Sequence, residues 1–314
     1  MQNDNAEISL PASMTLGSRK QPRRKNGWDL WRPYLYVLPS IFLLLIFYIY
    51  PILNNFYLSF FKWDLINPKQ FIGLENFEAL ITNKTFGTIF KNTLTYMFCS
   101  VGLTVTISLF MAVWLNRPTK FRTLIQGFVF TPHIISLVSV SFIWMWLFNE
   151  RYGLLNYLLG YLGIENIRWL SSKEMAMPAI ILVSVWKHVG YDTLMLIGGL
   201  QAIPVQLYEA ASLESKNGFK IFRHITLPML SPTLFFVLIM NLINAAKSFD
   251  TISIMTQGGP VNATNTLVYY IYERAFNYMQ IGRASAGGVV LFIILMILTI
   301  MYFLMLNKRV HYIH

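Results

Sequence analysis

Residues that could bind a polar solute stand in two apolar stretches of the chain. They are Lys187, His188, Asp192, Asn241, Asn244, Lys247 and Ser248. Asn241, Asn244 and Ser248 recur at intervals of three and four, so they share one face of a helix. Amides and hydroxyls on one face can exchange hydrogen bonds with the hydroxyls of a sugar. Ionisable side chains are costly in an apolar environment, which makes the lysines, the histidine and the aspartate candidates for function.

The same residues also have structural interpretations, which the sequence leaves open. Lys187 and Asp192 could pair with each other across a turn and a half of helix. The polar face could form hydrogen bonds between helices instead of contacting a solute. If Lys187, His188 and Lys247 do line a solute path, their positive charge would suit an anionic sugar.

Motifs for catalysis and for cofactor binding are missing from the sequence. It has no GxxxxGKS/T phosphate loop, no HExxH, no CxxC and no GxSxG. The histidines are scattered, and no pair within an apolar stretch has the spacing of metal ligands. They are His133, His188, His224, His311 and His314. We therefore expect no catalytic residue, metal site or cofactor in this chain.

The composition indicates a membrane protein. The 314 residues are 55% hydrophobic and only 12% charged, against about 25% charged in an ordinary soluble domain. This disfavours a soluble enzyme and a disordered protein, because both need charge to meet water. The net charge of +11 would suggest nucleic acid as a partner in a soluble protein. Here it indicates basic cytoplasmic loops, and no nucleic acid is expected.

Six apolar stretches are long enough to cross the hydrocarbon core, which takes about 20 residues of helix. They are Tyr34–Phe60, Leu94–Leu115, Leu124–Phe148, Met177–Leu200, Met229–Ser248 and Ala286–Leu306. The predicted fold class is therefore an all-α integral membrane protein with six transmembrane helices. The candidate solute-binding residues fall in the fourth and fifth stretches.

Basic residues concentrate before the first stretch and in alternate loops, as with Arg23, Arg24, Lys120 and Arg122. Lys and Arg are enriched on the cytoplasmic side, so both termini are predicted to be cytoplasmic. Residues 1–27 predict a disordered basic tail beside anionic membrane lipid. Residues 28–314 predict a single transmembrane domain. The first outer loop contains FIGLENFEALI, whose periodicity predicts a short interfacial helix.

The loop of residues 201–228 predicts two short helices on the cytoplasmic side. Pro204 suits a first helical turn, and good helix formers run from Val205 to Glu214. Asn217-Gly218 is a turn signal. A second short helix is expected over Phe219–Ile225, leading to Pro228 at the start of the fifth stretch. Such a compact loop, joined rigidly to a span, is a candidate docking site for a partner.

This loop resembles the EAA motif of ABC importer permeases. Glu209, Ala210 and Ala211 are followed at the family's spacing by Ile225, Leu227 and Pro228. The glycine of the motif is replaced by Ser215. If that glycine serves a turn with positive φ, the turn is expected to have moved to Asn217-Gly218.

Further segments resemble the carbohydrate branch of the family, its MalF-like and UgpA-like subunits. They are YPILNNFYLSF, FIGLENF, GLQAIPVQLYEAA and SFDTISIMTQGGP, spread over residues 30–306. The resemblance implies a MetI-like, type I ABC importer permease fold in the bacterial inner membrane. It implies a transport subunit, not an enzyme, that passes a sugar or oligosaccharide to the cytoplasm.

The resemblance also implies partners. These are a second, MalG-like permease, two ABC ATPase subunits that bind ATP and Mg, and an extracytoplasmic solute-binding protein. The implied coupling positions are Glu209, Ala210, Ala211, Ser215, Gly218, Lys220 and Arg223. Glu209 would face a basic group of the ATPase, and Lys220 and Arg223 would steer toward acidic groups there.

The main alternative is an ion-coupled secondary transporter of a small polar solute. Such a protein would carry acidic residues deep in several spans and an inverted repeat. The apolar stretches contain only Asp192, with Asp250 close to the end of the fifth, and no repeat is visible.

Overall fold

The computed structural model describes residues 27–117 and 119–306, so most of the predicted N-terminal tail lies outside it. The described residues form two compact units, one ending at Ile52 and the other beginning at Leu53, and each is described by itself. The first unit is helical through α1 (Gly27–Leu44), a π-helical turn (Leu45–Ile49) and the start of α2 (Tyr50–Leu58). An apolar helix runs over Tyr34–Leu58, which confirms the first predicted span.

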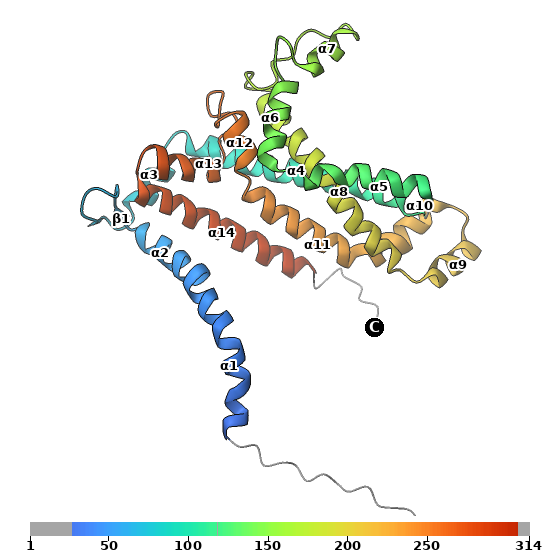
Figure 1. The fold of residues 1–314 in the computed structure, drawn as a ribbon, viewed down its shortest axis with the longest axis horizontal. Coiled ribbons are helices and arrows are strands. Elements are labelled where there is room, and N and C mark those ends of the chain that lie inside the picture. Colours follow the sequence, from blue (N-terminus) through green and yellow to red (C-terminus); the bar gives the residue numbers. More distant parts are fainter. Residues whose placement is uncertain (1–26, 118, 307–314) are drawn as a thin grey trace, which may run out of the picture. The chain divides into compact units, whose positions relative to one another are not determined.

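Long helices dominate the second unit, where α4, α8, α11 and α14 run along one another (Figure 1). Their bounds are α4 (Phe86–Leu115), α8 (Ala176–Gln201), α11 (Leu227–Ala246) and α14 (Ile281–Leu306). These confirm the second, fourth, fifth and sixth predicted spans, with α4 and α14 beginning earlier than the apolar core alone suggested. In the described part of the chain, five helices are long and apolar enough to cross a membrane, or six with one bent pair counted as a span.

Shorter elements close the two ends of these helices (Figure 1). At one end, strands β1 (Phe61–Lys62) and β2 (Gln70–Phe71) pair antiparallel beside α3 (Glu75–Ile81), the helix predicted from FIGLENFEALI. The remaining elements of this kind are α7 (Leu154–Gly160), α12 (Asp250–Met255), α13 (Leu267–Tyr272) and a π-helical turn (Glu273–Asn277). At the opposite end lie α9 (Val205–Glu214) and α10 (Gly218–Ile221).

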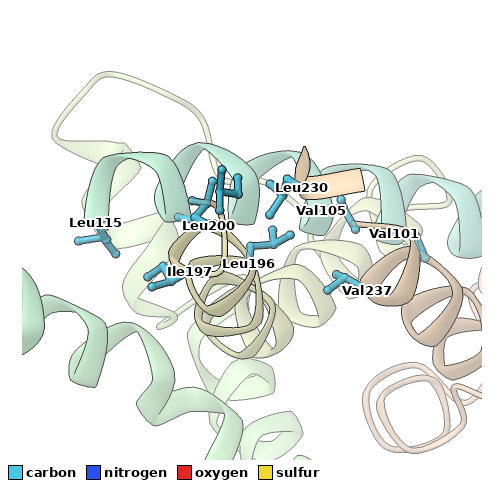
Figure 2. Packing of buried hydrophobic residues seen from close by; sticks show 10 residues of the cluster. Val101, Val105, Leu115, Leu196, Ile197, Leu200, Leu230 and Val237 are labelled. Carbon is cyan, nitrogen blue, oxygen red and sulfur yellow. The ribbon is translucent and has the colours of Figure 1, made fainter. Parts of the chain in front are cut away.

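The core of the second unit is a cluster of aliphatic side chains between α4, α8 and α11 (Figure 2). Leu115, Leu196 and Leu230 in this cluster are completely buried. Leu207 and Tyr208 of α9 pack against it, so the loop that precedes α11 is anchored to the bundle by apolar contact.

The third predicted span, Leu124–Phe148, is wrong as a single helix. It is broken into α5 (Lys120–Ile134) and α6 (Leu137–Leu147), which meet at an angle of 99°. Pro132 lies in the last turn of α5 and has no N–H for the helical ladder. Ile135 and Ser136 then adopt ψ values of 141° and 135°, which end the helix.

The break exposes backbone carbonyls that no helical N–H can reach, and Lys187 supplies the missing donors. Its Nζ donates to the carbonyl of Pro132 (2.8 Å), to that of His133 (2.9 Å) and to that of Ile135. A cation at a helix C-terminus is also favoured by the helix dipole. Lys187 and Asp192 therefore do not pair with each other, which was one of the interpretations left open by the sequence: the lysine reaches across to α5, and Asp192 accepts from Asn241 of α11.

Close helix contact brings α8 against α5. A Cβ built on Gly190 of α8 would collide with the backbone carbonyl of Val129 in α5. The small residues at the start of α14 work in the same way: Gly282 lies against the carbonyl of Phe61, and Gly287 against Ile271. The GRASAGG segment therefore packs within this subunit, one of the two roles that its sequence allows.

Replacing Lys187 by methionine should destabilise the described bundle. Lys187→Met keeps the length of the side chain but leaves three carbonyls at the end of α5 without their donor, a loss of about 2 kcal/mol or more. The measurement is the thermal unfolding midpoint of the protein in detergent. Lys247→Met is the matched control, because the Lys247 ammonium donates no hydrogen bond among the described residues. Equal midpoints for the two variants would contradict the capping role.

A second test compares two glycines of α8. Gly190→Ala forces a methyl group into the α5 backbone, and such overpacking costs about 1–3 kcal/mol. Gly198→Ala meets no atom within 4 Å and should be neutral or stabilising, since alanine favours helix by up to about 1 kcal/mol. Unfolding midpoints in the same detergent should fall for the first variant only; a similar fall for both would exclude close packing as the cause.

Candidate substrate cavity and coupling loop

A polar cavity of about 410 Å³ lies between α4, α8 and the end of α11. Its polar lining residues are Tyr96, Ser100, Thr104, Ser184, His188, Asn241, Asn244, Lys247, Ser248 and Asp250. Leu137, the first residue of α6, closes one side. The cavity therefore adjoins the break between α5 and α6.

Five of the seven candidate residues named from the sequence line this cavity: His188, Asn241, Asn244, Lys247 and Ser248. Lys187 and Asp192 do not line it. Sequence reasoning missed Tyr96, Ser100 and Thr104, which come from α4. Their spacing of four residues was a usable signal, because it places three hydroxyls on one helix face.

A second helix break lies at this cavity. Helix α11 ends at Ala246, residues Lys247–Phe249 leave the helical ladder, and α12 begins at Asp250. Lys247, Ser248 and Asp250, which stand at this break, all line the cavity. Interrupted helices at a solute path are a recurrent arrangement in transport proteins.

The hydroxyl of Tyr96 joins the three sides of the cavity. It donates to Ser184 Oγ of α8 at 3.0 Å and lies 2.8 Å from Ser248 Oγ, beyond the end of α11. Tyr96 is 3% exposed. A buried phenol with both hydrogen bonds made ties α4 to α8 and to the broken segment.

Hydrogen bonds also fix the orientation of the Asn241 and His188 side chains in the cavity wall. Asn241 Nδ2 donates to Asp192 Oδ2 at 2.6 Å and to the carbonyl of Val237 at 2.9 Å. His188 Nδ1 lies 2.8 Å from the carbonyl of Ser184, so this nitrogen carries the proton. Among the described residues, no group of His, Cys, Asp and Glu is arranged to hold a metal ion.

A larger groove of about 1130 Å³ runs along α4, α5 and α8, but its chemistry differs. Its walls are mainly aliphatic, with Leu103, Ile107 and Ile181 among them. Trp186 also lines this groove and contacts Trp144, with 5.5 Å between the ring centres. The smaller polar cavity is therefore the better candidate for binding a hydroxylated solute.

The loop with the EAA motif has the predicted architecture. Helix α9 covers Val205–Glu214, and α10 continues through a π-helical turn (Phe222–Thr226) into α11 without interruption. The side chains of Glu209, Lys220 and Arg223 are exposed, which leaves them open to a partner.

The chain turns at Asn217-Gly218 as expected, but the turn does not use a glycine with positive φ. Gly218 is not among the described residues with positive φ, and it begins α10. The chain reverses because Ser215 is extended (φ −151°) and Asn217 caps α10, its Oδ1 accepting from the N–H of Phe219 at 3.0 Å. A serine at the glycine position of the motif is therefore compatible with the loop.

Comparisons with known proteins agree with this geometry. Residues 104–312 match the family model of the binding-protein-dependent transport system inner membrane component. The sn-glycerol-3-phosphate transport system permease protein UgpA of Pectobacterium atrosepticum is 33% identical, over 90% of this chain and 96% of its own. The trehalose/maltose permease protein MalF of Thermococcus litoralis is 34% identical, over 86% and 91%. The arabinooligosaccharide permease protein AraP of Bacillus subtilis is 33% identical, over 88% and 91%.

The fold is also that of a solved transporter. A bacterial ABC transporter involved in the import of the acidic polysaccharide alginate superposes with a TM-score of 0.78, covering 88% of this chain and 96% of its own at 24% identity. The MetI-like fold expected from the resemblance is thereby confirmed. With a family model matching two thirds of its length and relatives matching nearly all of it, the chain belongs to the binding-protein-dependent inner membrane components, the permease subunits of ABC importers.

Proposed function

We propose that the cavity between α4, α8 and α11 is this subunit's part of a path for a sugar or oligosaccharide. The observation that carries the proposal is the lining itself: three hydroxyl-bearing residues of α4 face two amides and a broken helix within one 410 Å³ space. Such a lining can satisfy many hydroxyl groups at once. Relatives are named as permeases for trehalose/maltose and arabinooligosaccharides.

An anionic member of this substrate class is the preferred candidate. Lys247 lines the cavity and can bind an anionic group, and Asp250 is the only acidic residue in the lining. Lys187, which the sequence suggested as a further cation, is committed to the α5 carbonyls. Relatives named for sn-glycerol 3-phosphate transport an anion. Family membership disfavours the alternative of an ion-coupled secondary transporter.

The rest of the machinery follows as part of the same proposal. A second, MalG-like permease would complete the path, and an extracytoplasmic solute-binding protein would deliver the solute. Two ABC ATPase subunits, holding ATP and Mg, would dock on the loop of α9 and α10, which places this loop and both termini in the cytoplasm. The support is the family's description as binding-protein-dependent and the exposed EAA segment anchored to the core through Leu207 and Tyr208.

Removing the charge of Lys247 tests the solute path. In a transporter assembled from this chain, its partner permease, the ATPase and the binding protein, Lys247→Ala should lower ATPase stimulation by an anionic oligosaccharide about tenfold, the loss of one charge-assisted hydrogen bond. A neutral oligosaccharide should be affected less. Lys247→Arg keeps the charge and should retain most of the response. If Lys247→Ala leaves every anionic solute unaffected, the preference for an anion is wrong.

Reversing the charge of Glu209 tests the coupling loop. Glu209→Arg should abolish substrate-stimulated ATPase while leaving the unfolding midpoint unchanged, because the side chain is exposed. Glu214→Arg, five residues further along the same helix and also exposed, is the matched control. The measurement is ATPase activity with and without solute. Undiminished stimulation in Glu209→Arg would remove this residue from the ATPase contact.

A further inference from the structure

Asp192 is a carboxyl group that the solute path does not use directly. It lies on α8, is 3% exposed and does not line the cavity. Its hydrogen-bond partner among the described residues is Asn241 of α11, whose Nδ2 donates to Asp192 Oδ2 at 2.6 Å. The ammonium of Lys187, which could have neutralised it, is bound to α5. A buried acidic group held by one amide needs an explanation other than an ion pair.

The contacts of Asn241 determine which way its amide points. An amide NH₂ has two hydrogens, and here one goes to Asp192 Oδ2 and the other to the carbonyl of Val237. Both partners are oxygen acceptors, so a flipped amide would bring its own oxygen against two other oxygens. The nitrogen must therefore face Asp192, and the orientation is unambiguous.

The remaining polar atom of Asn241 is an acceptor that belongs to the cavity. Asn241 lines the cavity, and within the described residues its Oδ1 accepts no hydrogen bond. Among the described residues, six side-chain polar atoms are fully buried and have no hydrogen-bond partner, and Asn241 Oδ1 is not one of them. This oxygen therefore keeps some accessible surface. Asn241 therefore offers a carbonyl oxygen, with no N–H left to offer.

His188 shows the same polarity on the facing helix. Its Nδ1 donates to the carbonyl of Ser184, so the neutral ring has an unprotonated Nε2 as its second nitrogen. Two neighbouring wall positions, one on α8 and one on α11, are thus acceptors. Acceptors recognise O–H donors, the groups that a sugar carries in number.

We propose that Asp192 is a positioning residue for substrate recognition: it consumes the N–H groups of Asn241 so that the cavity presents an oxygen acceptor to a substrate hydroxyl. This inference rests on the proposed solute path. An aspartate is suited to the task because its Oδ2 accepts the one Nδ2 hydrogen that the Val237 carbonyl leaves free.

The first experiment needs no substrate. Side-chain amide exchange with water is followed by NMR in the ¹⁵N-asparagine-labelled protein, with the Asn241 signal identified by its loss in Asn241→Asp. The amide hydrogens should exchange slowly in the parent chain and at least about tenfold faster in Asp192→Leu, because one of their two acceptors is gone. Equal exchange in both would overturn the proposal, whatever the transporter carries.

The second experiment exchanges the partners. Asp192→Asn with Asn241→Asp preserves a hydrogen bond between α8 and α11 but places a carboxylate at the cavity wall. The unfolding midpoint of this double variant should equal that of the parent. In the full complex, with the binding protein delivering an alginate trisaccharide, ATPase stimulation should fall about tenfold or more. Stimulation by maltotriose should fall less. Recovery of both the midpoint and the alginate response would mean that the pair is only a structural tie.

The two experiments separate this inference from the proposed function. If the parent complex responds to neither probe while amide exchange behaves as expected, the substrate assignment fails and the positioning of Asn241 stands. If the parent responds but Asp192→Leu changes neither exchange nor response, the positioning role fails and the solute path stands. Should Asp192→Leu not fold, the exchanged pair still gives a decisive result.

Discussion

The need to satisfy backbone polar groups away from water governs this structure. Helices meet this need internally, so the backbone groups that an interruption sets free need other partners. The break between α5 and α6 is compensated by Lys187, whose ammonium binds three carbonyls at the end of α5. The contact lies where the chain turns by 99° from α5 into α6, and Leu137, the first residue of α6, borders the cavity.

The cavity follows the same rule. Its polar groups are arranged so that those nearest the protein interior are occupied: Tyr96 by two serines, and the Asn241 amide by Asp192 and a carbonyl. The hydrogen-bonding atoms that have no internal partner are those available at the cavity. Since a buried polar group without a partner costs about 1–3 kcal/mol, the internal bonds decide which atoms remain for a solute. In the proposed solute path, selectivity would therefore be set partly by residues that no solute touches.

Sequence reasoning succeeded where local chemistry decides. Hydropathy located the long helices, and Pro204 with the helix formers after it predicted α9 with both of its observed ends. It failed where distant residues decide. Pro132 hardly changes the apolar character of its stretch, so the break was missed, and the partner of Lys187 lies more than fifty residues earlier. The hydroxyl-bearing residues of α4 were not predicted as part of the site, although their spacing of four residues places them on one helix face.

The uninterrupted helix from Gly218 to Ala246 gives the subunit a mechanical property. Its 29 residues span roughly 43 Å, at 1.5 Å per residue, with a π-helical turn and Pro232 within that length. In the proposed transporter, a displacement of α10 would be passed along this helix to its first break, the three residues Lys247–Phe249. At this break Ser248 contacts the Tyr96 hydroxyl of α4, and Phe249 packs against the apolar cluster that contains Tyr96. A displacement at the coupling loop would thus move residues that line the cavity.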